Sequence, residues 1–222
     1  MAAEICNDSH PFAACLPFGI SVNLIHGNFK EIAMVSEADY FAYLESIEGK
    51  AEYQNGVIYD MAGGSPRHGL ITMNCGTAIG SQLKDKNCGV YSPDVLLGVE
   101  LAHSYFFPDL FVACGKLELD KVNRNAVKNP QVIVEVLSPS TMDRDRTSKL
   151  LRYMQIPSLQ EYILVEQHKP LVDVCFINDR GVWDSETVRG LDAMVKIRSL
   201  GIEVAMADIY RLVDFEVPAE PS

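Results

Sequence analysis

Apolar side chains recur at helical spacing in three parts of the chain. The first follows Ser36, a residue type that caps helices, and the second follows the pair Ser65-Pro66, which favours a helix start. The third is stopped by Pro157, which cannot continue a helix. The expected helices are residues 36–48, the stretch from Ser65 up to Gly89, and residues 142–155.

Short runs rich in β-branched and aromatic residues predict strands between and after these helices. Asn55-Gly56 is a dipeptide that a tight type I′ turn prefers, so the flanking residues 52–54 and 57–59 predict a hairpin. The run 131–137 is apolar except for Glu135 and its first residue, which is typical of a central strand covered on both faces. The other expected strands are residues 90–101, 105–114, 161–166 and several short antiparallel strands from Leu171 onward.

The order helix, strand, strand, strand, helix, strand predicts an α/β fold. We expect a central mixed β-sheet flanked by helices, with extra antiparallel strands at its edge. Residues 1–34 show no clear period and are expected to form a loosely specified arm. Residues 35–215 are expected to form the domain, and residues 216–222 a C-terminal tail.

Composition supports a packed core and argues against a general nucleic-acid binder. Of the 222 residues, 48% are hydrophobic and 22% charged, and the formal net charge is -11. Nonspecific binding of nucleic acid depends on Lys and Arg that neutralise phosphates, so this surface opposes it. A role on DNA or RNA therefore requires a local basic patch or bound cations.

The chain shows neither a membrane span nor a secretory signal. No apolar run reaches the ~18 residues that a membrane span requires. Residues 11–25 are moderately apolar, but Glu4 and Asp8 precede them and the first basic residue is Lys30, which is the opposite of a signal peptide's charge pattern. We therefore expect a cytoplasmic protein.

The cysteines are scattered and form no CxxC pair. This pattern favours buried free thiols in a reducing compartment over zinc ligation or a disulfide framework. The six positions are Cys6, Cys15, Cys75, Cys88, Cys114 and Cys175.

Two carboxylates stand where apolar residues are expected. Asp109 follows Pro108 and shares a strand face with Phe111, while Glu135 shares a face with Ile133 in the most apolar strand. A buried carboxylate without a partner costs several kcal/mol, and two on neighbouring strands repel each other unless one stays protonated or a cation lies between them. Such oxygen ligands suit Mg²⁺ or Mn²⁺. The alternative is a turn role for Asp109 and an arginine partner for Glu135.

Five segments, in this order, resemble one protein family. The first reads AEYQNGVIYDMAGGSPRH (51–68) and the third VIVEVLSPST (132–141). The others are YFFPDL (105–110), the stretch 145–153 with its DR, Lys149 and Tyr153, and IPSLQEY (156–162). Together they resemble the Uma-two family of putative restriction endonucleases, in the PD-(D/E)XK nuclease-like superfamily, over roughly residues 35–215.

The resemblance implies a restriction-endonuclease-like core with Asp109 and Glu135 as metal ligands. The superfamily's usual lysine, two residues after the glutamate, is absent, because Leu137 stands there. The resemblance points instead to Lys149 on the following helix. The helical pattern leaves its role open, because Leu150, Leu151 and Met154 form the apolar stripe and Lys149 lies off it, so it is either catalytic or a solvated lysine.

Three further residues are weaker candidates, each with a structural alternative. Asp94 is either a third metal-binding carboxylate or a bend residue after Pro93. Glu52 either approaches the metal or stabilises the hairpin loop. His68 either touches phosphate or another ligand, or is a partly buried core histidine.

The sequence thus predicts a metal-dependent endonuclease acting on DNA, with Asp109, Glu135 and Lys149 as its catalytic residues. The alternative is an inactive nuclease-fold protein that serves as a binding or regulatory module, which the net charge and the displaced lysine favour. A homodimer fits both functions, because the edges of the late strands need a cover.

Overall fold

A computed structural model describes residues 34–61, 63–139 and 141–215. The predicted arm, except for Met34, and the predicted tail lie outside the described residues. The chain divides into two compact units, residues 1–61 and 62–222. The extent of the single domain predicted at 35–215 stays a prediction.

The described part of the first unit is one helix followed by one hairpin. Helix α1 (Glu37–Ser46) begins at Ser36, whose hydroxyl accepts a hydrogen bond from the Asp39 backbone N–H. Strands β1 (Ala51–Gln54) and β2 (Val57–Asp60) pair antiparallel across Asn55 and Gly56. Both turn residues have positive φ, 46° and 92°, which confirms the predicted hairpin and explains the Asn-Gly pair.

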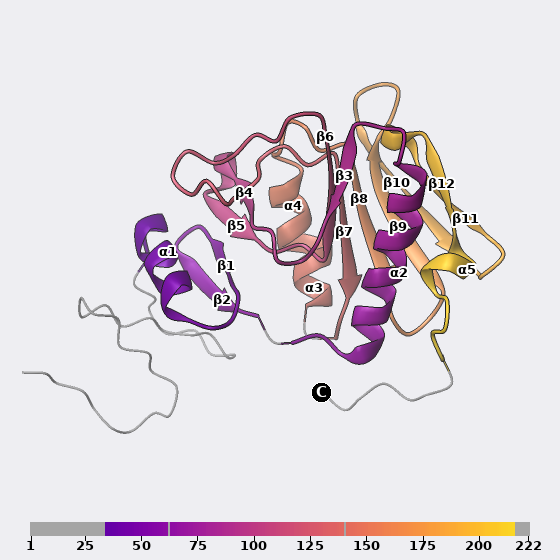
Figure 1. The fold of residues 1–222 in the computed structure, drawn as a ribbon, viewed down its shortest axis with the longest axis horizontal. Coiled ribbons are helices and arrows are strands. Elements are labelled where there is room, and N and C mark those ends of the chain that lie inside the picture. The colour runs from indigo at the N-terminus through magenta and orange to yellow at the C-terminus, as the bar shows by residue number, and fades with distance from the viewer. Residues whose placement is uncertain (1–33, 62, 140, 216–222) are drawn as a thin grey trace, which may run out of the picture. The chain divides into compact units, whose positions relative to one another are not determined.

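The second unit is built on a six-stranded mixed sheet (Figure 1). Its strand order is β10-β9-β8-β7-β6-β3, and β7–β8 is the parallel pair among otherwise antiparallel neighbours. This arrangement confirms the predicted α/β class with antiparallel strands at the edge. The strands are β3 (Cys88–Tyr91), β6 (Leu110–Cys114), β7 (Val132–Leu137), β8 (Glu161–Glu166), β9 (Leu171–Ile177) and β10 (Trp183–Arg189).

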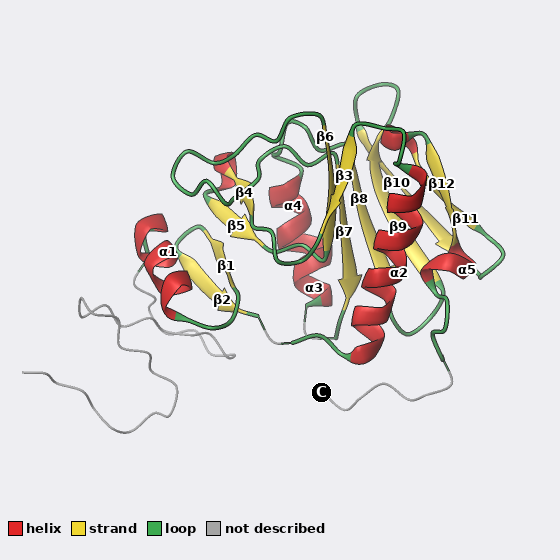
Figure 2. Cartoon of the chain, viewed as in Figure 1, coloured by secondary structure: helices red, strands yellow, loops and turns green. Residues whose placement is uncertain are grey.

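Helices cover both faces of this sheet (Figure 2). Helix α2 (Pro66–Gln82) packs on one face together with the hairpin of β11 (Met194–Ile197) and β12 (Ile202–Ala205) and with α5 (Met206–Ile209). The turn η3 (Arg198–Leu200) joins β11 to β12. The other face is covered by the segment made of α3 (Met142–Arg144), η2 (Asp145–Lys149) and α4 (Leu150–Tyr153).

The alternation of side chains in β7 decides which face each residue serves. Val132, Val134 and Val136 belong to the core beneath α2, whereas Ile133 and Leu137 belong to the core beneath α4. Glu135 therefore points toward the α4 side, as predicted from its position between Ile133 and Leu137.

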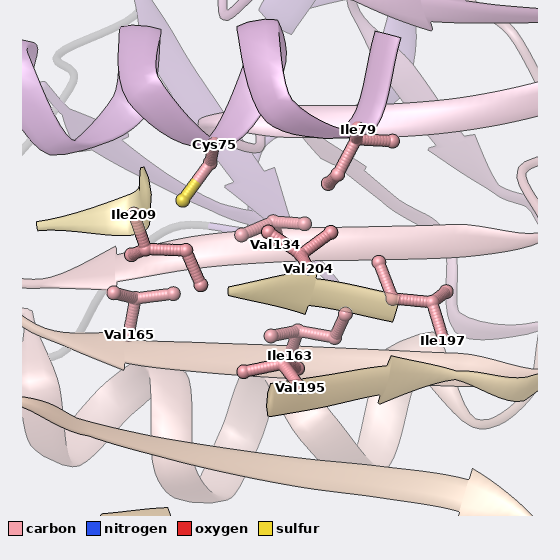
Figure 3. A pocket seen from close by; sticks show the side chains of 9 residues that line it. All are labelled: Cys75, Ile79, Val134, Ile163, Val165, Val195, Ile197, Val204 and Ile209. Atoms are coloured by element: carbon pink, nitrogen blue, oxygen red, sulfur yellow. The ribbon is translucent and has the colours of Figure 1, made fainter. Parts of the chain in front are cut away.

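The core beneath α2 contains a small cavity (Figure 3). Its lining is made of apolar side chains from α2, the sheet, the β11–β12 hairpin and α5, so it is a packing defect without a group that would orient a ligand. The lining residues are Cys75, Ile79, Val134, Ile163, Val165, Val195, Ile197, Val204 and Ile209.

Prolines interrupt two segments that were predicted as continuous strands. Residues 90–101 contain the end of β3, a turn at Pro93 and β4 (Leu97–Val99), and residues 105–114 divide at Pro108 into β5 (Ser104–Phe106) and β6. Proline offers no N–H to a strand ladder, which accounts for both breaks. Strands β4 and β5 pair antiparallel around the turn η1 (Glu100–Ala102).

The prediction of free cysteines is wrong for one pair. Cys88 and Cys114 are directly opposite each other on β3 and β6 and form a disulfide. Cys75 is free and buried, and Cys175 is free and half-buried. Sequence separation hid the pair, because the two cysteines meet only when β3 joins the sheet beside β6. Cys6 and Cys15 lie outside the described residues.

Among the residues described, none of the helices combines the length and the apolar character needed to cross a membrane.

Candidate functional site

Asp109 and Glu135 lie next to each other at the N-terminal end of β6. The antiparallel register places Leu110 opposite Val134, so the next residues outward are Asp109 and Glu135. The Asp109 backbone N–H donates to Glu135 Oε2 at 3.2 Å, and the Val136 N–H donates to Asp109 Oδ2 at 2.7 Å. The two carboxylates that sequence patterning singled out are thus neighbours on adjacent strands.

Glu135 is buried and belongs to a polar cluster inside an apolar core. Its Oε1 accepts hydrogen bonds from Lys149 Nζ and from the Tyr153 hydroxyl, both at 3.0 Å. Burial raises the pKa of the Glu135 carboxyl, and the charges of Asp145 and Asp109 act in the same direction, whereas Lys149 lowers it. A cation near this carboxylate would favour its ionised form.

Lys149 is buried, and the helical pattern misplaced it. Its side chain is 4% exposed, whereas Leu151, assigned to the apolar stripe, is 65% exposed. The cause is the π-helical turn η2, which adds a residue to the turn and changes the face that the following residues present. Lys149 and Tyr153 consequently face the sheet together, with Lys149 Nζ 5.9 Å from the centre of the Phe106 ring.

Asp145 is a member of this cluster that the sequence reasoning missed. Its side chain is 3% exposed, and its Oδ1 lies 3.2 Å from Lys149 Nζ. The available signal was the i,i+4 spacing of Asp145 and Lys149 on a predicted helix, which brings two side chains together. A buried location for such a pair was not inferred, because helix patterns assign charged residues to the solvent face.

His68 reaches the same centre from α2. Its Nε2 lies 3.1 Å from Asp109 Oδ2, and the two side chains are 18% and 15% exposed. Burial lowers the pKa of His68, but the hydrogen bond and charge of Asp109 outweigh it and leave the pKa raised. A Cβ at Gly64 would lie 2.9 Å from His68 Nδ1, so the missing side chain there makes room for the imidazole. His68 is therefore part of the centre and not an isolated core histidine.

Asp94 and Glu52 are the two remaining candidates from the sequence. Asp94 is exposed in the turn after β3. Because Tyr91 pairs with Phe111, the chain leaves β3 at the same sheet edge where Asp109 precedes β6. Glu52 lies on β1 of the first unit. The roles suggested for both residues stay predictions.

The oxygen atoms of Asp109 and Glu135 are the kind of ligand that a hard divalent cation prefers, but two side chains are fewer than such a cation needs. Asp109 and Glu135 offer carboxylate oxygens, which Mg²⁺ and Mn²⁺ prefer, and Mg²⁺ commonly keeps several waters as further ligands. Within residues 34–61, 63–139 and 141–215, however, no three His, Cys, Asp or Glu side chains are arranged to hold a metal ion. Two carboxylates plus water is therefore the composition that the described residues fit, and Asp94 as a third ligand stays a prediction.

The fold belongs to a known class of proteins. A crystal structure described as a putative nuclease belonging to DUF820, from Anabaena variabilis ATCC 29413, matches with a TM-score of 0.63 and 18% sequence identity, covering 77% of this chain and 96% of that chain. The fold is restriction-endonuclease-like.

The family follows from the sequence matches. The model of the Uma2 family, described as "Putative restriction endonuclease", matches residues 38–207, and the chain belongs to this family. Two proteins of Synechocystis sp. (strain ATCC 27184 / PCC 6803 / Kazusa) are similar. Uncharacterized protein slr1290 is 30% identical over 86% of this chain and 100% of its own length. Uncharacterized protein sll1609 is 32% identical over 60% of this chain and 76% of its own length.

Proposed function

We propose that the protein is a metal-dependent endonuclease that hydrolyses DNA phosphodiester bonds. The observation that carries the proposal is that Asp109, Glu135 and Lys149 lie close together in a restriction-endonuclease-like fold, where β6 begins beside β7. Family membership supports a nuclease, and the donor chemistry supports Mg²⁺ or Mn²⁺.

Each residue has a chemical task in this proposal. Asp109 and Glu135 would hold the cation, which when bound supplies positive charge that stabilises the transition state at the phosphate and favours deprotonation of water. Asp109 and His68 are the more exposed members, so substrate approaches from their side. Lys149 supplies a fixed ammonium that orients the attacking water or offsets developing charge. The net charge of -11 makes a bound cation more necessary, because a polyanion is otherwise repelled.

The test is cleavage of supercoiled and linear DNA by the purified full chain with Mg²⁺, with Mn²⁺ and with a chelator. We expect strand breaks with either metal and none with the chelator, and calorimetry should show divalent-ion binding. The proposal is refuted if the chain does not cleave DNA and also does not bind a divalent ion in any of these conditions.

A second candidate is a nuclease-fold binding or regulatory module. It is favoured by one observation: Lys149 already pairs with two carboxylates and is nearly inaccessible. Metal-dependent DNA cleavage by the purified chain would support the nuclease and exclude the inactive module.

Self-association is expected under either function. Strand β10 forms one edge of the six-stranded sheet and can pair with a second copy. Light scattering of the purified chain should give the mass of a dimer, and the mass of a single chain at micromolar concentration would contradict this expectation.

A further inference from the structure

One buried lysine serves two buried acids at the candidate centre. Lys149 Nζ lies 3.0 Å from Glu135 Oε1 and 3.2 Å from Asp145 Oδ1, and all three side chains are no more than 4% exposed. The proposed function assigns tasks to Glu135 and Lys149 but none to Asp145. The burial of Asp145 beside Lys149 requires an explanation, because burying a carboxylate costs folding free energy.

The negative charge of Glu135 has two possible partners, Lys149 and a divalent cation. Glu135 pairs with Lys149 here, and in the proposed function it also holds a cation. If Glu135 turned to the cation with no other acid nearby, Lys149 would become a buried ammonium with no carboxylate opposite it, which is strongly unfavourable. Asp145 supplies that second carboxylate from the preceding turn of the same segment.

Asp145 is held in place by contacts that do not involve Glu135. Its backbone carbonyl accepts a hydrogen bond from the Tyr162 hydroxyl at 3.1 Å. The next residue, Arg146, pairs with Glu166 on β8 at 3.0 Å and with Asp173 on β9 at 2.7 Å. The segment that carries Asp145 is thus tied to two strands, so the carboxylate stays fixed if Glu135 moves.

The Asp145 contact is ionic in character. Asp145 Oδ1 is buried and makes no aligned hydrogen bond within the part of the chain that the structure describes, although Lys149 Nζ is close. Charge, and not a directional bond, is therefore what Asp145 offers to the lysine.

We propose that Asp145 is a positioning residue that retains the Lys149 ammonium at the centre and thereby releases Glu135 to bind a divalent cation. The inference rests on the proposed function. It predicts that Asp145 acts on cation binding only through Lys149.

The main test is Mn²⁺ binding measured by calorimetry on four full-length proteins: the natural chain, Asp145→Asn, Lys149→Met and the double variant. Without Asp145, Lys149 and Mn²⁺ compete for Glu135, so Asp145→Asn should weaken binding ~10-fold or more, as expected for a close charge pair. When Lys149 is also replaced, there is no competitor, and the same change should weaken binding by less than ~3-fold.

Matched variants control for charge and folding. Asp143→Asn removes the same charge from an exposed residue two positions earlier and should leave Mn²⁺ binding unchanged. Asp145→Glu keeps the charge and should recover part of the affinity. If Lys149→Met does not fold, as judged by circular dichroism, Lys149→Gln replaces it. Equal weakening by Asp145→Asn with and without Lys149, or no weakening, overturns the inference.

A second measurement decides the matter without metal. Each of Glu135→Gln and Asp145→Asn leaves Lys149 one acid, but together they leave it none. The double variant should therefore shift the unfolding equilibrium constant at least ~10-fold beyond the product of the two single effects, and this excess should vanish in the Lys149→Met background. Lack of the excess overturns the inference even if the protein cuts DNA. The excess in a chain that binds no Mn²⁺ supports retention of Lys149 by Asp145 while refuting the proposed nuclease.

Discussion

Glu135→Gln is expected to lower DNA cleavage by more than ~100-fold and to remove measurable Mn²⁺ binding, while the protein stays folded. Glutamine has nearly the same shape and keeps an oxygen that can accept from Lys149 or Tyr153. It lacks the negative charge that a divalent ion requires. The fold should survive because Lys149 retains Asp145 as a partner. Cleavage assays, calorimetry and circular dichroism on the same preparation measure the three effects.

Glu161→Gln is the matched control for this prediction. Glu161 is also a buried glutamate of the same sheet, but its carboxylate accepts hydrogen bonds from the backbone N–H groups of Arg198 and Ser199. Its replacement should cost roughly 1–3 kcal/mol of unfolding free energy through weaker hydrogen bonds, and it should leave Mn²⁺ binding intact. If Glu135→Gln binds Mn²⁺ as tightly as the natural chain, Glu135 is not a metal ligand.

Lys149→Met is expected to lower the unfolding free energy by about 3–5 kcal/mol and to abolish cleavage. Methionine replaces much of the aliphatic stem but leaves Glu135 and Asp145 facing each other without the ammonium that joins them. Breaking a buried pair by removing one partner is costly because the remaining charge stays out of water. Urea denaturation followed by circular dichroism gives the loss of unfolding free energy.

Lys84→Met is the surface counterpart of this change. Lys84 is exposed in the turn after α2, so its replacement should alter the unfolding free energy by no more than about 0.5 kcal/mol. A Lys149→Met protein as stable as the Lys84→Met protein would show that the buried ammonium contributes nothing to the fold.

Where local chemistry decides the outcome, the sequence predicted which carboxylates lie close together. Asp109 and Glu135 were identified because each interrupts an apolar strand, and strands that follow each other in the chain commonly pair. The Asn55-Gly56 hairpin followed from the positive φ that both residues adopt. Both inferences need only the neighbouring residues and the two-residue period of a strand.

The parts that sequence reasoning missed depend on contacts between distant segments or on irregular backbone. The contact of His68 with Asp109 requires the N-terminal part of α2 to lie over the start of β6. Burial of Asp145 and Lys149 depends on a π-helical turn, which a 3.6-residue period does not represent. The disulfide between Cys88 and Cys114 depends on β3 lying beside β6. None of these features is set by the residues adjacent to it in the chain.

The parallel pairing of β7 and β8 has a consequence for how this centre can diversify. Strands β7 and β8 point the same way, so the backbone must return across the sheet between them, and α3, η2 and α4 are that return path. Lys149 therefore lies on a connection, or bridge, whose two ends are held in place by β7 and β8. Insertions and deletions are poorly tolerated within such a bridge, whereas the β9–β10 hairpin, which lies outside it, is free to vary in length and to acquire new surface contacts.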